Sequence, residues 1–223
     1  MFTSFKKLTT AALGGLLFSS TAAYSDDKDM YQVTITNITN SINFTPILVT
    51  SHRREIALFH LGSAASSDLT AIAEGGDTSG LAATLASNPD VIDIQSSGGL
   101  LAPGQSVTVA VSAAHGAKRI SIASMMLPTN DGFIALDSVK TPRKSSTSFY
   151  SPGYDAGTEA NDELCVNIPG PTCGGTAFSP GVNPGDEGYV HIHRGTQGVG
   201  DLSGDKDWRN PVAKITIERL ENH

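Results

Sequence analysis

Several short segments of this 223-residue chain alternate apolar and polar residues, and this alternation constrains the fold more than any other feature. It is clearest over residues 31–37, 106–111, 119–125 and 133–136. Because successive side chains of a strand point to opposite faces, a period of two is typical of a half-buried β-strand. Further short strands are expected over residues 46–50, 56–59, 91–94, 189–193 and 213–220.

Two helices are expected to interrupt the strands. Residues 67–74 carry apolar side chains at helical spacing, and Gly75-Gly76 follows as at a helix C-terminus. Residues 81–85 form the second candidate.

Residues 142–185 are rich in Gly, Pro, Ser and Asn and are expected to form a long irregular loop. The predicted fold is all-β: one antiparallel β-sandwich with two short helices in an insertion.

The N-terminus is typical of a secretory signal. Lys6 and Lys7 precede an apolar run that ends near Leu17, and a small-residue site follows at Ala23-Tyr24-Ser25. The alternative is an N-terminal membrane anchor, for which the apolar run is too short. We therefore expect residues 1–25 to be a signal peptide, residues 26–223 to form the mature domain, and the protein to be exported to the periplasm or the extracellular medium.

The amino-acid composition limits the kinds of partner that the chain can bind. The chain has 15 Lys and Arg against 22 Asp and Glu, a formal net charge of −7. Such an acidic balance argues against a nucleic-acid partner, since phosphate backbones are bound by excess cations. No interior segment approaches the roughly 18 uninterrupted apolar residues of a membrane span, so no transmembrane segment is expected after signal removal.

Cys165 and Cys173 are the only cysteines. In an oxidising compartment we expect them to form one disulfide that closes a small loop. Two free thiols are the alternative.

Acidic residues occur at two turns. Asp131 is at the tip between two predicted strands, and Asp155 and Glu159 are in the long loop, ahead of Asp162 and Glu163. Carboxylates four residues apart across a Gly can converge on one cation, and Ca²⁺ prefers such oxygen ligands. The alternative is that these acids are solvated turn residues.

His191 and His193 lie two apart in a predicted strand and so share one face. Zn²⁺ or Cu²⁺ would need a further ligand, for which His52, His60 and His115 are candidates. The alternative is a pair of hydrogen-bonded strand histidines.

The sequence lacks the motifs of common catalytic and nucleotide sites. Gly-x-Ser-x-Gly, Gly-x-Gly-x-x-Gly and the phosphate-binding P-loop pattern are all absent. We therefore expect no catalytic residues, and a role other than that of an enzyme.

Two segments are conspicuous, Ser124-Met-Met-Leu-Pro-Thr-Asn-Asp131 and, after it, Asp155-Ala-Gly-Thr-Glu159. In sequence and in order they resemble the spondin N-terminal domain in its stand-alone bacterial form. Tyr31–Thr39 and Asp207–Arg219 also match, so the resemblance extends over roughly residues 30–220.

The resemblance implies a C2-like β-sandwich that holds one Ca²⁺ with Asp131, Asp155 and Glu159. Glu159 stands where animal members usually carry aspartate. Relatives in animals act in the extracellular matrix, which implies adhesion or recognition of a protein or glycan. Two alternatives stay open: a transition-metal-binding protein or metalloenzyme that uses His191 and His193, and a structural envelope protein.

Overall fold

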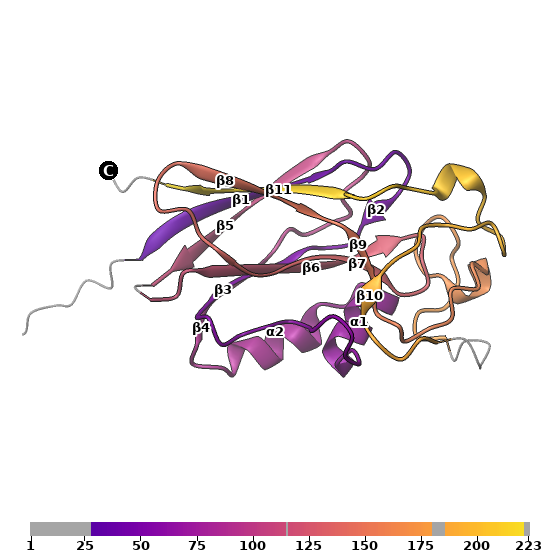
Figure 1. Cartoon of the computed structure of the whole chain (residues 1–223), viewed down its shortest axis with the longest axis horizontal. Helices are drawn as coiled ribbons and strands as arrows, with labels where there is room; N and C mark the ends of the chain where they lie inside the picture. The colour runs from indigo at the N-terminus through magenta and orange to yellow at the C-terminus, as the bar shows by residue number, and fades with distance from the viewer. Residues whose placement is uncertain (1–27, 115, 180–185, 221–223) are drawn as a thin grey trace, which may run out of the picture.

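The first of two antiparallel sheets has four strands in the order β5–β1–β11–β8 (Figure 1). Their bounds in the computed structural model, which describes residues 28–114, 116–179 and 186–220, are β1 Asp29–Asn37, β5 Ser106–Ala113, β8 Ser146–Ser151 and β11 Ala213–Arg219. The expected signal peptide and His115 lie outside the described residues.

The second sheet runs in the order β10–β9–β7–β6–β3–β4, and β2 pairs with β6 beside this path. The bounds are β2 Asn43–Phe44, β3 Leu48–His52, β4 Val91–Ser96, β6 Arg119–Leu127, β7 Gly132–Lys140, β9 Gly153–Asp155 and β10 His191–Ile192. The predicted all-β antiparallel sandwich is therefore confirmed.

The core lies between the two sheets. On β1 the side chains of Tyr31, Val33 and Ile35 are buried, while the residues between them are only half-buried. Ile215 and Ile217 of β11 complete the same inner face. This is the arrangement that the alternating sequence predicts, because one face of each strand packs inward and the other faces water.

Two helices cover the outer face of the second sheet (Figure 1). They are α1 Ser67–Gly75 and α2 Ser79–Ala86, close to the predicted ranges. Ser66 caps α1 by accepting a hydrogen bond from the Leu69 amide at 3.2 Å, and Gly76 ends it with a left-handed φ of 67°. Among the described residues, no helix is long and apolar enough to cross a membrane.

Two predictions about secondary structure were wrong. Residues 56–59 form a loop rather than a strand; Leu58 of this loop is buried among the helices, and its amide donates to Asp137 Oδ1 at 2.8 Å. The segment 142–185 is not wholly irregular, because it supplies β8, β9 and a short 3₁₀ helix, Cys165–Asn167. The predicted disulfide between Cys165 and Cys173 is present.

Candidate cation site

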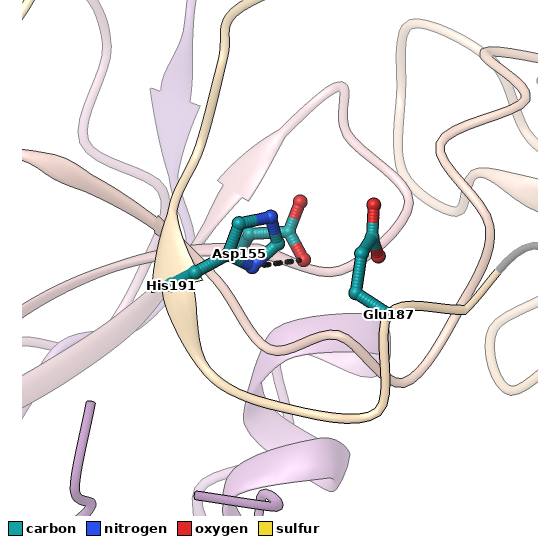
Figure 2. Close-up of side chains that lie close together, drawn as sticks. All are labelled: Asp155, Glu187 and His191. Atoms are coloured by element: carbon teal, nitrogen blue, oxygen red, sulfur yellow. Dashed lines mark ion pairs between the residues drawn. The ribbon is translucent and has the colours of Figure 1, made fainter. Parts of the chain in front are cut away.

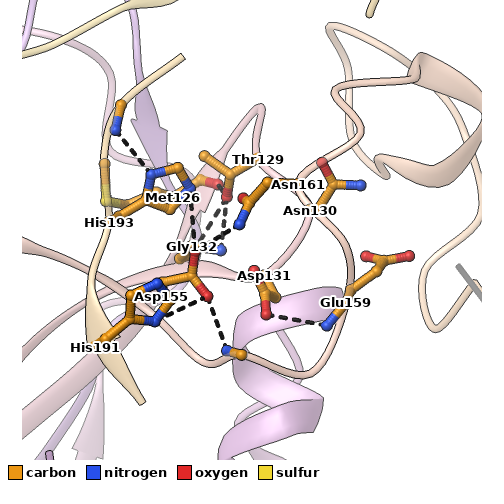
Figure 3. Close-up of polar contacts among 12 residues, drawn as sticks. Met126, Thr129, Asn130, Asp131, Gly132, Asp155, Glu159, Asn161, His191 and His193 are labelled. Carbon is orange, nitrogen blue, oxygen red and sulfur yellow. Dashed lines mark hydrogen bonds and ion pairs between the residues drawn. The ribbon is translucent and has the colours of Figure 1, made fainter. Parts of the chain in front are cut away.

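Three strands of the second sheet meet at one end of the sandwich and bring acidic and histidine side chains together. Asp131 immediately precedes β7, Asp155 ends β9, and His191 begins β10. In the antiparallel register, Gly132 and His191 both lie opposite Asp155. Residues far apart in the sequence therefore become neighbours through strand pairing (Figure 3).

Asp131 is fully buried, and half of its carboxylate has no partner. Its Oδ2 accepts hydrogen bonds from the amides of Thr158 at 2.8 Å and Glu159 at 3.1 Å, whereas its Oδ1 accepts none. Burial, and next the charge of Asp155, raise the pKa of Asp131 to about 8. A buried carboxylate with a free oxygen is costly unless a positive charge compensates it.

Asp155 is also buried and lies between two imidazoles. Its Oδ1 accepts from the Gly157 amide at 2.8 Å, and its Oδ2 accepts from Asn161 Nδ2 at 2.7 Å. His191 Nδ1 lies 3.6 Å from Oδ1, and His193 Nε2 lies 3.9 Å from Oδ2 (Figure 3). Burial raises the pKa of Asp155. Both histidines thus face one carboxylate, as their spacing predicts.

Glu159 is oriented differently from the two aspartates. Its backbone amide faces Asp131, while its carboxylate lies on the far side of Asp131 from Asp155 (Figure 3). Oε1 accepts from the Ser179 hydroxyl, and the buried Oε2 has no hydrogen-bond partner. Burial, and then the charges of Glu74 and Asp131, raise the pKa of Glu159 to about 8.

Glu187 belongs to the same cluster, although it was not among the ligands expected from the sequence. One ligand atom each of Asp155, Glu187 and His191 lie within 4.8 Å of one another (Figure 2). Glu187 Oε2 and His191 Nδ1 are buried and without hydrogen-bond partners. Its position four residues before His191, just ahead of the predicted strand 189–193, was the available signal.

The hydrogen bond that His193 accepts determines which of its ring nitrogens could bind a metal. His193 Nδ1 accepts a hydrogen bond from the Gly195 amide at 3.0 Å, so the ring proton of the neutral imidazole is on Nε2, facing Asp155. Burial, and then His191, lower the pKa of His193 to about 4. The ring is therefore neutral. Its Nε2 is buried and without a hydrogen-bond partner, as is His191 Nδ1, but in this tautomer Nε2 carries the ring proton and offers no lone pair to a metal.

The other histidine candidates lie elsewhere in the described part of the chain or outside it. His52 on β3 bonds Ser121 Oγ through Nε2 at 2.8 Å and the Arg53 carbonyl through Nδ1 at 2.6 Å. His60 lines a separate cavity with Asp137 and Tyr154. Neither joins the group around Asp155.

Two nearby acids have structural partners instead. Glu163 accepts hydrogen bonds from the amides of residues 197–199 and so holds that loop. Asp162 accepts from Asn130 Nδ2 at 3.0 Å and from the Leu164 amide at 2.9 Å. Their oxygens are satisfied by the protein, which distinguishes them from the free oxygens of Asp131, Glu159 and Glu187.

Comparison with known proteins gave one family match. The Spondin_N family model matches residues 30–161, more than half of the chain, and this range contains Asp131, Asp155 and Glu159. A search of curated proteins found no match. Glu187, β10 and β11 lie beyond the matched range, yet β11 is hydrogen-bonded between β1 and β8 and so completes the first sheet.

Proposed function

Since the chain belongs to the Spondin_N family, we propose that it is an exported Ca²⁺-binding β-sandwich module that recognises a protein or glycan and is not an enzyme. The family and the Cys165–Cys173 disulfide are consistent with export. The observation that carries the Ca²⁺ proposal is the fully buried carboxylate of Asp131, whose Oδ1 has no partner and whose neighbour is the carboxylate of Asp155.

Ca²⁺ suits this arrangement. It takes about six to eight oxygen ligands at roughly 2.3–2.6 Å, from carboxylates, carbonyls and water. Asp131 and Asp155 would supply the protein ligands at the sheet end. Glu159 is the third ligand that the family pattern assigns; its side chain must rotate toward Asp131, and its unpartnered Oε2 is available for this.

The surface near the site supports a role in recognition. The loops of residues 156–179 and 186–212, with the short strand β10 among them, gather at the same end of the sandwich (Figure 1). They expose large apolar side chains, namely Val166, Phe178, Tyr189, Ile192 and Val199. A cation that links the loop after β9 to the turn before β7 would lower the mobility of this surface. Exposed apolar groups among polar loops are typical of partner-binding sites.

A thermal denaturation experiment tests the proposal. Extracellular modules bind Ca²⁺ with Kd values of about 10⁻⁴–10⁻³ M. With a Kd of about 0.1 mM, about 10 mM Ca²⁺ would stabilise the fold by about 2.7 kcal/mol, or roughly 5–10 °C in Tm for a chain of this size. The expected result is this rise over the chelator-treated protein. No rise in the wild type would overturn the Ca²⁺ proposal.

The alternative based on both His191 and His193 has weaker support. Both rings have a buried nitrogen without a hydrogen-bond partner, but His193 Nδ1 accepts from the Gly195 amide, so its unpartnered Nε2 carries the ring proton and is not a metal ligand in this tautomer.

A further inference from the structure

We propose that Asp155, Glu187 and His191 form a second cation site, which takes Zn²⁺ or a similar transition-metal ion beside the proposed Ca²⁺. This inference rests on the proposed function in one respect, because Asp155 would be shared by the two ions. The three ligand atoms, one nitrogen and two oxygens, already lie within 4.8 Å of one another (Figure 2).

Two buried atoms of this group have no hydrogen-bond partner and are suited to bind a cation. His191 Nδ1 and Glu187 Oε2 are both buried, and neither has a hydrogen-bond partner. Buried polar atoms are nearly always paired in native proteins. Asp131, whose buried Oδ1 is also unpartnered, immediately precedes Gly132, which pairs with Asp155, and so lies beside the same group. A cation bound by Asp155, Glu187 and His191 would satisfy Glu187 Oε2 and His191 Nδ1, and the proposed Ca²⁺ would satisfy Asp131 Oδ1.

The imidazole nitrogen determines the class of ion. Ca²⁺ prefers oxygen ligands throughout, whereas Zn²⁺ readily combines His nitrogen with carboxylate oxygen in tetrahedral sites. Zn–N and Zn–O bonds of about 2.0–2.2 Å place tetrahedral ligand atoms about 3.4 Å apart. The ligand atoms, which lie within 4.8 Å of one another, would move closer together on binding the ion.

The surroundings hold the ligands in place. His191 is fixed by strand pairing opposite Asp155, and its ring contacts that of Tyr189 at a centroid distance of 5.3 Å. Asp155 is oriented by the Gly157 amide and by Asn161 Nδ2. Such supporting hydrogen bonds are typical of metal sites, where they orient the ligands.

The local charge also favours two ions. The carboxylates of Asp131, Asp155, Glu159 and Glu187 carry four formal negative charges when ionised, and electrostatic repulsion couples Asp131 to each of the others. One Ca²⁺ balances half of this charge, and a second divalent ion balances the rest. Two dications that share a carboxylate are therefore compatible with this cluster.

Metal titration of the whole exported protein tests the second site. The protein is stripped with chelator and titrated with Zn²⁺ by calorimetry while Ca²⁺ is held at about 10 mM, well above the expected Kd. We expect one Zn²⁺ per chain. His191→Ala and Glu187→Gln should each weaken Zn²⁺ binding at least tenfold, while the Ca²⁺-dependent rise in Tm stays as in the wild type. His60→Ala, which changes a histidine outside the group, should bind Zn²⁺ normally.

The outcomes separate the two proposals. Asp131→Asn should abolish the Ca²⁺ response but leave Zn²⁺ binding within about threefold. Zn²⁺ binding with no Ca²⁺ response in the wild type would overturn the proposed function alone. Zn²⁺ binding that is absent, that is unchanged by His191→Ala, or that Ca²⁺ displaces mole for mole would overturn the second site.

Discussion

Gly157 lies against the backbone of Tyr189, so close that a Cβ added at position 157 would be 2.3 Å from the Tyr189 carbonyl oxygen. Gly157 also has a left-handed φ of 66°, and its own carbonyl accepts a hydrogen bond from the Gly188 amide at 2.9 Å. This contact joins the loop after β9, which follows Asp155, to the segment that carries Glu187 and His191. The glycine of the Asp-Ala-Gly-Thr-Glu segment thus holds the two halves of the candidate site together.

Gly157→Ala should therefore destabilise the protein and the site. A left-handed conformation costs an L-residue about 1–2 kcal/mol, and the backbone clash should add roughly 1–3 kcal/mol, as in other overpacked sites. Urea denaturation measures the free energy of unfolding. Gly98→Ala is the matched control, because Gly98 has a φ of 85° and nothing within 4 Å of its added Cβ. Equal losses in the two variants would show that the Tyr189 contact has no energetic role.

Asp131→Asn should change stability in opposite directions with and without Ca²⁺. In chelator, burial and next the charge of Asp155 disfavour the ionised form of Asp131, so folding costs either protonation of this carboxyl or an uncompensated buried charge; a neutral Asn avoids this cost and should leave Tm equal to or above that of the wild type. In Ca²⁺ the variant loses a ligand and should melt below the wild type. The two melting curves, measured at pH 7 in both buffers, check this. A lower Tm for the variant in both buffers would contradict it.

His52 should make stability depend on pH. Burial lowers its pKa in the folded state, with Asp137 acting to raise it and Arg119 to lower it further. The unfolded chain, whose His titrates near pH 6.5, therefore binds more protons below that pH than the folded protein. The His52 contribution is fully present above pH 6.5 and is lost as the pH falls toward the folded pKa, by at most about 1.4 kcal/mol per pH unit.

Denaturant unfolding of His52→Gln between pH 7.5 and 5 isolates this effect. The difference between the wild type and the variant should shrink as the pH falls, because the variant has no imidazole to protonate. His60→Gln, at an exposed histidine, provides the control. A difference that stays constant over this range would exclude His52 as the source.

Reduction of the Cys165–Cys173 disulfide should lower stability modestly. The bridge closes a loop with a sequence separation of 8, and a loop of this size is expected to stabilise the fold by about 2.5 kcal/mol through the unfolded chain. The double variant Cys165→Ser/Cys173→Ser should show this loss in denaturant. The wild type in reducing buffer should match the double variant, and an unchanged midpoint in both would contradict the expected contribution.

The buried face of the first sheet could be predicted from the sequence because it depends on a pattern of neighbouring residues. Val33 and Ile35 alternate with polar residues, and that pattern alone specifies one buried face. The strand β8 was missed because it has the polar sequence STSFYS on the edge of its sheet, where Ser148 pairs with Thr216 across strands. Ile56 and Leu58 were mistaken for a strand because a loop that packs under helices has the same apolar composition.

The candidate site was only partly predictable for a similar reason. Asp131 and Asp155 were first selected as acids at turns that could converge on one cation, and the family resemblance then assigned both to a Ca²⁺ site. Glu187 was missed because its partners, Asp155 and His191, lie on different strands. Only the pairing of β9 with β10 brings these two residues together beside it. The orientation of Glu159 was also beyond sequence reasoning, because it depends on which way one side chain turns in a buried loop.

Direct titration of the chelator-treated protein with Ca²⁺ tests the central claim most directly. Calorimetry should give one Ca²⁺ per chain for the wild type, with a Kd of about 10⁻⁴–10⁻³ M. Asp131→Asn and Asp155→Asn should each abolish binding, while Asp162→Asn, at an acid whose oxygens already have protein partners, should leave it intact. No binding by the wild type, or binding that survives both aspartate substitutions, would contradict the account.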